Sequence, residues 1–330
     1  MAISSAIQAV RDISNDLVIL PESPSYDEIT ASYFSELERE LTPAAFLTPS
    51  SATQVADILK ALKPFVNNLK IAIAGSGQQT TPAVANVRDG LTIHLRNLKG
   101  IEVNAEKKIV SIAAGERMGD VYETAAASGL GVMGNRHSTG GIGGDALQGR
   151  LHLDIDDYVL TISGGLSYFS YARGFVCDDV VNYEVVLGSG EIVNANAENN
   201  KDLWVALKGG GSNFGVVTRF DLRAFELGQM WGGKIFYFEP SFKSQIQALV
   251  DYLHDPNPDT NIHICISLGY AAAIGGIMCM NDIFNTKPEK PKALEPFADV
   301  SPQVDQMKSL RTDSLKGLTT ETFGGAAKDR

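Results

Sequence analysis

KGGGSNFGVVTRFDL (Lys208–Leu222) is a glycine-dense turn that leads directly into an apolar strand. Two more glycine-rich turns precede it, Gly75–Gln79 and Gly140–Gly144, each within one strand or helix of a β-like run. Glycine lets the backbone reach positive φ and approach a ligand closely. One such loop alone is as often an ordinary surface turn. Three of them predict main-chain amides wrapped around one large, phosphate-bearing cofactor.

Composition narrows the class of protein. The 330 residues are 44% hydrophobic, which allows a substantial core, and the length suggests about two domains. A formal net charge of −11, from 39 acidic and 28 basic residues, argues against a nucleic-acid surface. Small molecules are therefore the expected partners.

Cysteine usage and hydropathy indicate the compartment. Cys177, Cys265 and Cys279 are widely spaced and form no CxxC pair, so neither a zinc site nor a disulfide framework is indicated. No apolar run approaches the ~20 residues of a membrane-spanning helix. The first residues also lack a secretory signal pattern. We expect a cytoplasmic protein that contacts no membrane.

Periodicity predicts helices and strands that alternate irregularly. Residues 1–40 are expected to be helical, with an apolar stripe from Tyr33 to Leu41. Strands at 180–187 and 192–195 flank a hairpin turn, Gly188–Gly190. Hairpins mixed with crossovers favour an α+β fold over a doubly wound parallel sheet. The expected division is a helical segment at 1–40, a cofactor domain at 41–227 and a second domain at 228–330 that lacks an obvious closing element.

Other cofactor and catalytic motifs are absent from the sequence. No GxGxxG follows a first strand and opens a helix, and no GxxxxGK[ST] occurs, which excludes the common nicotinamide and P-loop signatures. No GxSxG elbow or spaced carboxylate pair supports hydrolysis. The histidines show no metal spacing, so no metal site is predicted. His137, just before the second glycine turn, is the one histidine with a candidate catalytic role.

Successive motifs between about Tyr33 and Gly233 resemble a known family. The chain is similar to the FAD-linked oxidases with a PCMH-type flavin domain, and within them to the fungal branch that resembles berberine bridge enzyme. The resemblance rests on motifs that occur in the same order here, at Pro43–Pro49, Ala72–Gln79, Gly100–Val103, Gly115–Tyr122, Gly140–Gly144, Gly174–Val180 and Asp202–Lys208.

This resemblance implies a fold and a reaction. It implies an α+β flavin domain of two subdomains that hold FAD, followed here by a partial α+β substrate domain. It also implies hydride transfer from a small organic substrate to the flavin, with dioxygen as the acceptor, in fungal secondary metabolism. The cofactor-binding residues that it implies are Gly75, Ser76, Gly77, Gln78, Gln79, Gly140, Gly141, Gly143, Gly144, Gly215, Val216 and Val217.

Three positions depart from the family pattern in ways that bear on the cofactor. Gln78 stands where many relatives carry the histidine that bonds covalently to the flavin, and Arg136 lies near the position of a second, cysteinyl link. The flavin is therefore predicted to be noncovalent. Ala74 stands where an arginine is common, which removes a positive charge from the phosphate side and predicts weaker binding.

Two larger departures leave a second reading open. Arg150–Gly164 separates Gly149 from Gly165, whereas relatives run directly from the glycine turn into the Gly-Leu-Ser pattern. It is either a translated intron or a real loop, and we expect it to disturb the flavin site. The chain also ends within the expected substrate domain, so no catalytic base can be named. The alternative to an oxidoreductase is thus a truncated or mis-spliced relative that is noncatalytic.

Overall fold

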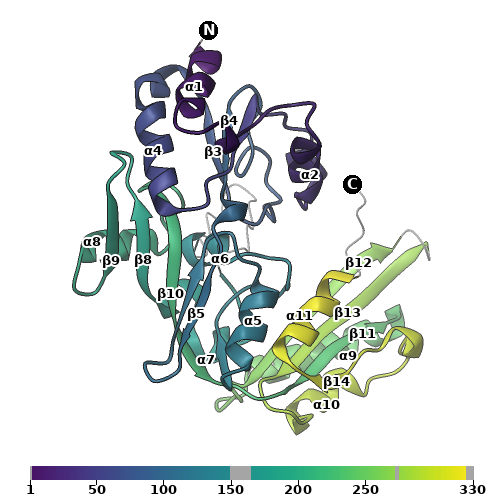
Figure 1. Cartoon of the computed structure of the whole chain (residues 1–330). Coiled ribbons are helices and arrows are strands. Elements are labelled where there is room, and N and C mark those ends of the chain that lie inside the picture. The colour runs from purple at the N-terminus through teal and green to yellow at the C-terminus, as the bar shows by residue number, and fades with distance from the viewer. Residues whose placement is uncertain (1, 149–164, 272–274, 325–330) are drawn as a thin grey trace.

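The computed structural model describes residues 2–148, 165–271 and 275–324, which form three sheets with helices packed against them (Figure 1). Parallel and antiparallel pairing both occur, so the α+β prediction is confirmed. The predicted insertion Arg150–Gly164 lies outside the described residues. Within those ranges, none of the helices has both the length and the apolar character needed to cross a membrane.

The first sheet has the strand order β1-β2-β4-β3. Its strands are β1 (Val18–Ile19), β2 (Ala45–Leu47), β3 (Ile71–Ala74) and β4 (Leu91–His94). β4 runs parallel to both β2 and β3, which requires crossover connections. One of these is α4 (Ala52–Leu62), which begins where the Ser51 hydroxyl accepts a hydrogen bond from the Gln54 amide. α1 (Ala2–Arg11) packs against α4.

The N-terminal residues differ from the expected single apolar stripe. They form α1, α2 (Pro24–Ser32) and α3 (Glu36–Arg39), and they also supply β1 to the first sheet. Tyr33 caps the end of α2 in extended geometry and is fully buried, while Phe34 and Leu37 are 40% and 53% exposed. The predicted stripe was wrong because the chain turns between the two helices. Residues 2–40 thus contribute one strand, β1, to the first sheet.

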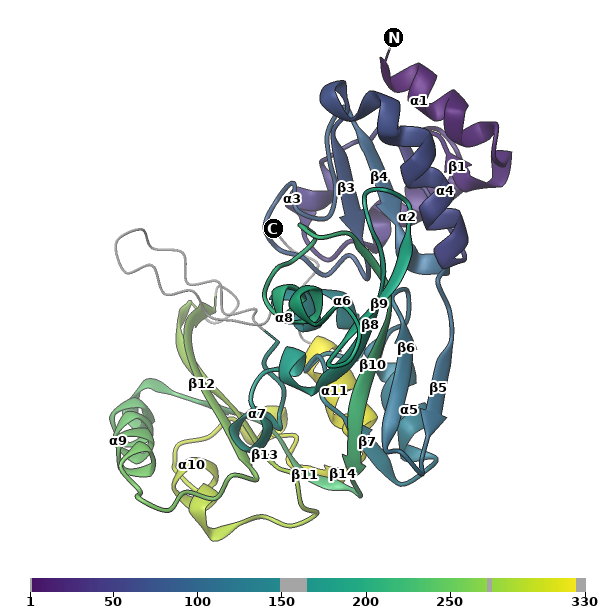
Figure 2. The same ribbon diagram turned by 90° about the vertical axis from the view of Figure 1, so that its left-hand side faces the viewer.

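The second sheet is antiparallel and has the order β5-β6-β10-β8-β9 (Figure 2). Its strands are β5 (Ile101–Asn104), β6 (Ile109–Ala113), β8 (Val180–Val186), β9 (Ile192–Asn196) and β10 (Val216–Glu226), and β7 (Leu130–Val132) pairs with the far end of β10. Its helices are α5 (Met118–Ala126), α6 (Ile142–Gln148), α7 (Ser170–Arg173) and α8 (Lys201–Leu207). Tyr183 and Phe220 meet edge to face in its core, with ring centroids 5.8 Å apart. The predicted hairpin is β8–β9.

The third sheet has the order β12-β13-β11-β14 and a hydrophobic core of its own. Its strands are β11 (Met230–Tyr237), β12 (Ile262–Ala271), β13 (Gly276–Asn285) and β14 (Arg311–Asp313). Leu249 and Tyr252 of α9 (Phe242–Leu253) pack against that core, which includes Phe297 and Ala298 of α10 (Glu295–Ala298).

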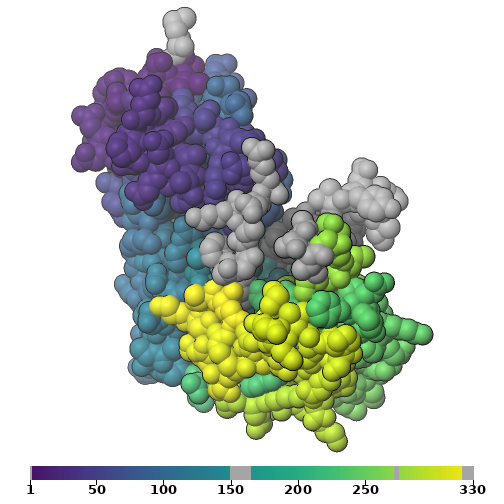
Figure 3. Space-filling view, turned by 90° about the vertical axis from the view of Figure 1, so that its right-hand side faces the viewer, coloured from purple at the N-terminus to yellow at the C-terminus, as the bar shows by residue number. Residues whose placement is uncertain are grey.

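A final helix, α11 (Leu315–Gly324), leaves the third sheet and packs against α5, although the sequence predicted no closing element there. Lys316 on α11 pairs with Glu123 on α5 at 2.5 Å. The space-filling view shows yellow C-terminal residues beside the blue residues of the second sheet and its helices (Figure 3). The described chain therefore returns to the helices of the second sheet after crossing the third sheet.

Candidate functional site

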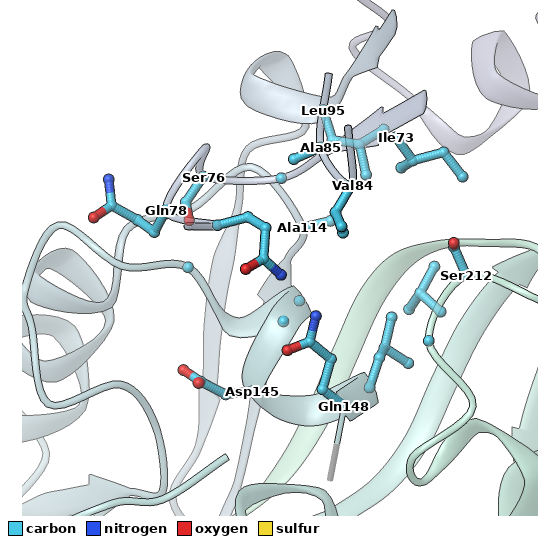
Figure 4. A pocket seen from close by; sticks show the side chains of 18 of the residues that line it. Ile73, Ser76, Gln78, Val84, Ala85, Leu95, Ala114, Asp145, Gln148 and Ser212 are labelled. Carbon is cyan, nitrogen blue, oxygen red and sulfur yellow. The ribbon is translucent and has the colours of Figure 1, made fainter. Parts of the chain in front are cut away.

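The three glycine turns meet around one cavity of about 240 Å³ between the first two sheets (Figure 4). The first turn follows β3, the second precedes and opens α6, and the third leads into β10. The predicted residues that line the cavity are Gly75, Ser76, Gly77, Gln78, Gln79, Gly141, Gly143, Gly144, Gly215, Val216 and Val217. Segments more than 100 residues apart in sequence thus converge, while their role in cofactor binding stays a prediction.

Gly140 is the predicted residue that lies outside the lining. Its carbonyl accepts a hydrogen bond from the Met118 amide at 2.8 Å. A Cβ added at Gly140 would lie 2.5 Å from Cγ of Asn135. Gly140 therefore packs closely against the cavity-lining Asn135, and its role in cofactor binding stays a prediction.

Much of the cavity surface is main chain. A Cβ added at Gly144 or Gly211 would meet no atom within 4 Å, and at Gly143 it would meet only the Phe220 ring, at 3.9 Å. Gly77 and Gly211 have φ of 72° and 58°, which side chains disfavour. Exposed amides in such turns suit an anionic ligand such as a phosphate. The volume is below the ~300–1,000 Å³ of typical ligand pockets, so it accommodates only part of a dinucleotide.

The wall opposite α6 is apolar. Four apolar side chains from the part of the chain around the first sheet line the cavity here: Ile73, Val84, Ala85 and Leu95 (Figure 4). Buried Glu38 holds this wall, because its Oε1 accepts hydrogen bonds from the Val84 and Ala85 amides at 3.2 and 3.0 Å. Apolar surface facing main-chain amides suits a ligand that carries both an aromatic ring and phosphate.

Three polar side chains that sequence reasoning missed also line the cavity: Asn135, Asp145 and Gln148. Asn135 donates through Nδ2 to Oδ2 of Asp145 at 2.9 Å, and its Oδ1 accepts from the His137 amide at 2.8 Å. Burial raises the pKa of Asp145 to about 7. The available signal was position alone, since Asp145 directly follows Gly144.

Asp145 is expected to make stability depend on pH. Because its folded-state pKa is raised from 3.8 to about 7, the folded protein binds more protons than the unfolded chain between these values. The free energy of unfolding then falls as pH rises from about 4 to about 7 and is flat above. We expect Asp145→Asn to stabilise more at pH 8 than at pH 5, by on the order of 2 kcal/mol. Urea titrations at both pH values measure this difference.

The matched control for this prediction is Asp305→Asn, at an exposed position remote from the cavity. It should change the free energy of unfolding by less than about 0.5 kcal/mol at either pH value. An equal gain at pH 5 and pH 8 in Asp145→Asn would show that Asp145 does not titrate in this range.

His137 lies beside the site but is not among the cavity-lining residues. Its buried Nδ1 has no hydrogen-bond partner among the described residues. Burial, followed by the charges of Arg136 and Lys234, lowers the pKa of His137, so its imidazole is neutral near pH 7.

Cys177 is buried at 2% exposure, and we find it packed as a small core residue. In the described ranges, no three His, Cys, Asp or Glu side chains gather to form a metal site.

Comparison with known proteins agrees with this geometry. A family model described as an FAD binding domain matches residues 43–152. FAD-dependent monooxygenase tpcD of Cochliobolus heterostrophus is 33% identical over 252 residues, 76% of this chain and 45% of the relative. FAD-dependent monooxygenase prx3 of Penicillium roqueforti is 31% identical over 93% of this chain and 57% of its own length. The chain thus spans about half the length of these curated relatives.

Solved structures share the fold. The 6-hydroxy-D-nicotine oxidase of Arthrobacter nicotinovorans superposes with a TM-score of 0.76 at 20% identity, over 92% of this chain and 63% of that chain. The carbohydrate oxidase of Microdochium nivale gives a TM-score of 0.74 at 21% identity, over 96% of this chain and 64% of that chain. The fold similarity therefore extends through the described part of the third sheet.

Proposed function

Because this chain belongs to the FAD-linked oxidases with a PCMH-type FAD-binding domain, we propose that the cavity between its glycine turns binds FAD and that the protein is an oxidoreductase. The observation that carries the proposal is the convergence of the three turns on one cavity. The exposed amides of the turns, the apolar wall and the polar side chains of Asn135, Asp145 and Gln148 together match a ligand with a diphosphate and flat rings.

Different residues of the cavity suit different parts of FAD. Main-chain amides at Gly75–Gln79 take the diphosphate without a lysine, and Val216 and Val217 offer apolar surface along the start of β10. Bound FAD would supply the electron-accepting chemistry for oxidation of a small organic substrate. The protein's own contribution is binding, orientation and exclusion of water around the ligand.

Dioxygen is the proposed electron acceptor, and secondary metabolism is the proposed setting. Several relatives are named FAD-dependent monooxygenases, and one, from Alternaria solani, is a bifunctional solanapyrone synthase, 31% identical over 88% of this chain. The absence of a spanning helix among the described residues and the cysteine pattern are compatible with the proposed cytoplasmic location.

Noncovalent attachment is proposed because Gln78 stands where many members of the family carry the histidine that bonds to the flavin, and Arg136 lies near the position where some carry a second, cysteinyl link. The test is an absorbance spectrum of the purified protein, taken before and after acid precipitation. We expect a flavin band that moves entirely into the supernatant. A flavin band that stays with the pellet would contradict noncovalent attachment, and a folded protein that FAD cannot reconstitute would contradict the function.

A noncatalytic FAD-binding relative is the second candidate. It is favoured by Arg150–Gly164, which lies just after the cavity-lining helix α6 in sequence. The same spectrum of a variant that lacks residues 150–164 tests whether this segment disturbs FAD binding. Higher FAD occupancy without the segment supports the second candidate, and equal occupancy counts against it.

A further inference from the structure

Arg117 lies between two of the glycine turns and donates hydrogen bonds to the first turn and to the residue that directly precedes the second. Its Nη1 donates to the Ser76 carbonyl of the first turn at 2.5 Å and to the Thr139 carbonyl, which leads into the second turn, at 2.6 Å. These carbonyls lie 41 and 22 residues away in sequence. Within residues 2–148 the two turns share no direct hydrogen bond, so this guanidinium is the hydrogen-bonding link between them.

The surroundings fix Arg117 in place. It is the N-cap residue of α5, and the first free amides of that helix bind the same segment: Met118 donates to Gly140, and Gly119 to Ser138, both at 2.8 Å. The first turn is held from its other side, where the Phe34 amide donates to the Gly77 carbonyl at 2.9 Å. Each turn thus has its own anchor, and Arg117 joins the two anchored turns.

The spacing between these turns is tight. A Cβ added at Gly141 would lie 2.8 Å from Cβ of Ser76, so the backbones are already at contact distance. A diphosphate bound by amides of these turns needs their separation to be correct before it arrives, because ordering a loop on binding weakens affinity.

We propose that Arg117 is a positioning residue that sets the separation of the two turns and thereby prepares the diphosphate subsite. The inference rests on the proposed FAD function. It assigns Arg117 no contact with the reacting atoms. Arginine is suited to the role because its planar guanidinium holds the two N–H bonds of Nη1 at a fixed angle toward the two carbonyls, whereas the lysine ammonium rotates at the end of a flexible stem.

The test compares wild type with Arg117→Met and Arg117→Lys. For Arg117→Met we expect dissociation constants for FAD and for ADP that rise by the same factor, about 10–100-fold, because ADP shares the diphosphate but lacks the flavin. Arg117→Lys should recover less than half of this loss on a logarithmic scale. Flavin fluorescence and calorimetry give the two constants.

A second measurement needs no ligand. In the apoprotein, backbone amides at Gly75–Gln79 and Ser138–Gly141 should exchange hydrogen faster in Arg117→Met than in wild type, with no change in the β8–β9 hairpin. Arg223→Met is the control cation, because Arg223 pairs with Asp179 at 3.6 Å and donates to neither turn. It should leave binding of FAD and ADP within about threefold of wild type.

The outcomes separate the two proposals. If wild type binds no FAD, the proposed function fails, while faster exchange in the two turns still supports Arg117 as their link. Unchanged exchange, or an FAD dissociation constant within threefold of wild type in folded Arg117→Met, overturns the inference. Full recovery by Arg117→Lys also overturns it, because charge alone would then suffice. Where Arg117→Met does not fold, Arg117→Lys and Arg117→Gln carry the same comparison.

Discussion

Replacing Gly141 with alanine is expected to raise the dissociation constant for FAD by about 5–150-fold, the equivalent of ~1–3 kcal/mol of overpacking. The new Cβ would lie 2.8 Å from Cβ of Ser76. Both atoms are bonded directly to the main chain, so no side-chain rotation relieves the clash and the turns must move apart. Titration of the apoprotein with FAD, followed by flavin fluorescence, measures the change.

A second substitution is expected to relieve the clash that Gly141→Ala creates. Ser76→Gly removes the opposing Cβ, so the double variant Gly141→Ala/Ser76→Gly should recover most of the lost affinity, and the two substitutions should be strongly non-additive. Gly188→Ala is the matched control, since a Cβ there meets nothing within 4 Å in a hairpin turn far from the cavity. Wild-type affinity in Gly141→Ala, or no recovery in the double variant, would show that the two turns are not packed in this way.

Phe220→Ala is expected to lower the free energy of unfolding by about 3–5 kcal/mol, because it deletes a fully buried ring and leaves a void. Phe220 is 1% exposed on β10, meets Tyr183 edge to face and also lines the cavity. It therefore supports the central strand and the ligand site at once. Urea denaturation of the apoprotein measures the loss, and FAD affinity should fall in parallel.

A nearby phenylalanine supplies the control. Phe214 precedes β10 and is 42% exposed, so Phe214→Ala should change the free energy of unfolding by no more than about 0.5 kcal/mol. Phe220→Leu, which keeps most of the buried apolar volume, should cost well under half of the alanine effect. A loss below about 1 kcal/mol in Phe220→Ala would mean that the core collapses around the site.

Local pattern was enough to predict the parts of this fold that local sequence controls. The glycine turns and the β8–β9 hairpin lie where turn residues and periodicity put them, and α9 at Phe242–Leu253 has the apolar spacing of an amphipathic helix. Turn conformation depends on residues within a few positions, and an amphipathic helix shows its period over a dozen residues. The three turns themselves predicted convergence on one large, phosphate-bearing ligand, whereas the identity of that ligand as FAD followed only from the family resemblance.

Contacts between distant segments could not be predicted in the same way. Arg117 sits in a motif that the sequence singled out, yet its two acceptors lie far along the chain and only the folded structure brings them together. In the sequence, Asp145 is distinguished only by its position after Gly144. Its raised pKa results from burial in the folded structure. α11 escaped notice because its weakly patterned residues are stabilised by α5, which lies nearly 200 residues earlier.

The position of β10 bears on how the chain can be synthesised safely. β10 separates β6 from β8 and pairs with both, although it is the last strand of its sheet to leave the ribosome. Until residue 226 emerges, the β5–β6 and β8–β9 hairpins each expose an unpaired edge of the kind that recruits other strands. A nascent chain that stalls before β10 is therefore the species most prone to aggregate, and the one that a chaperone must shield longest.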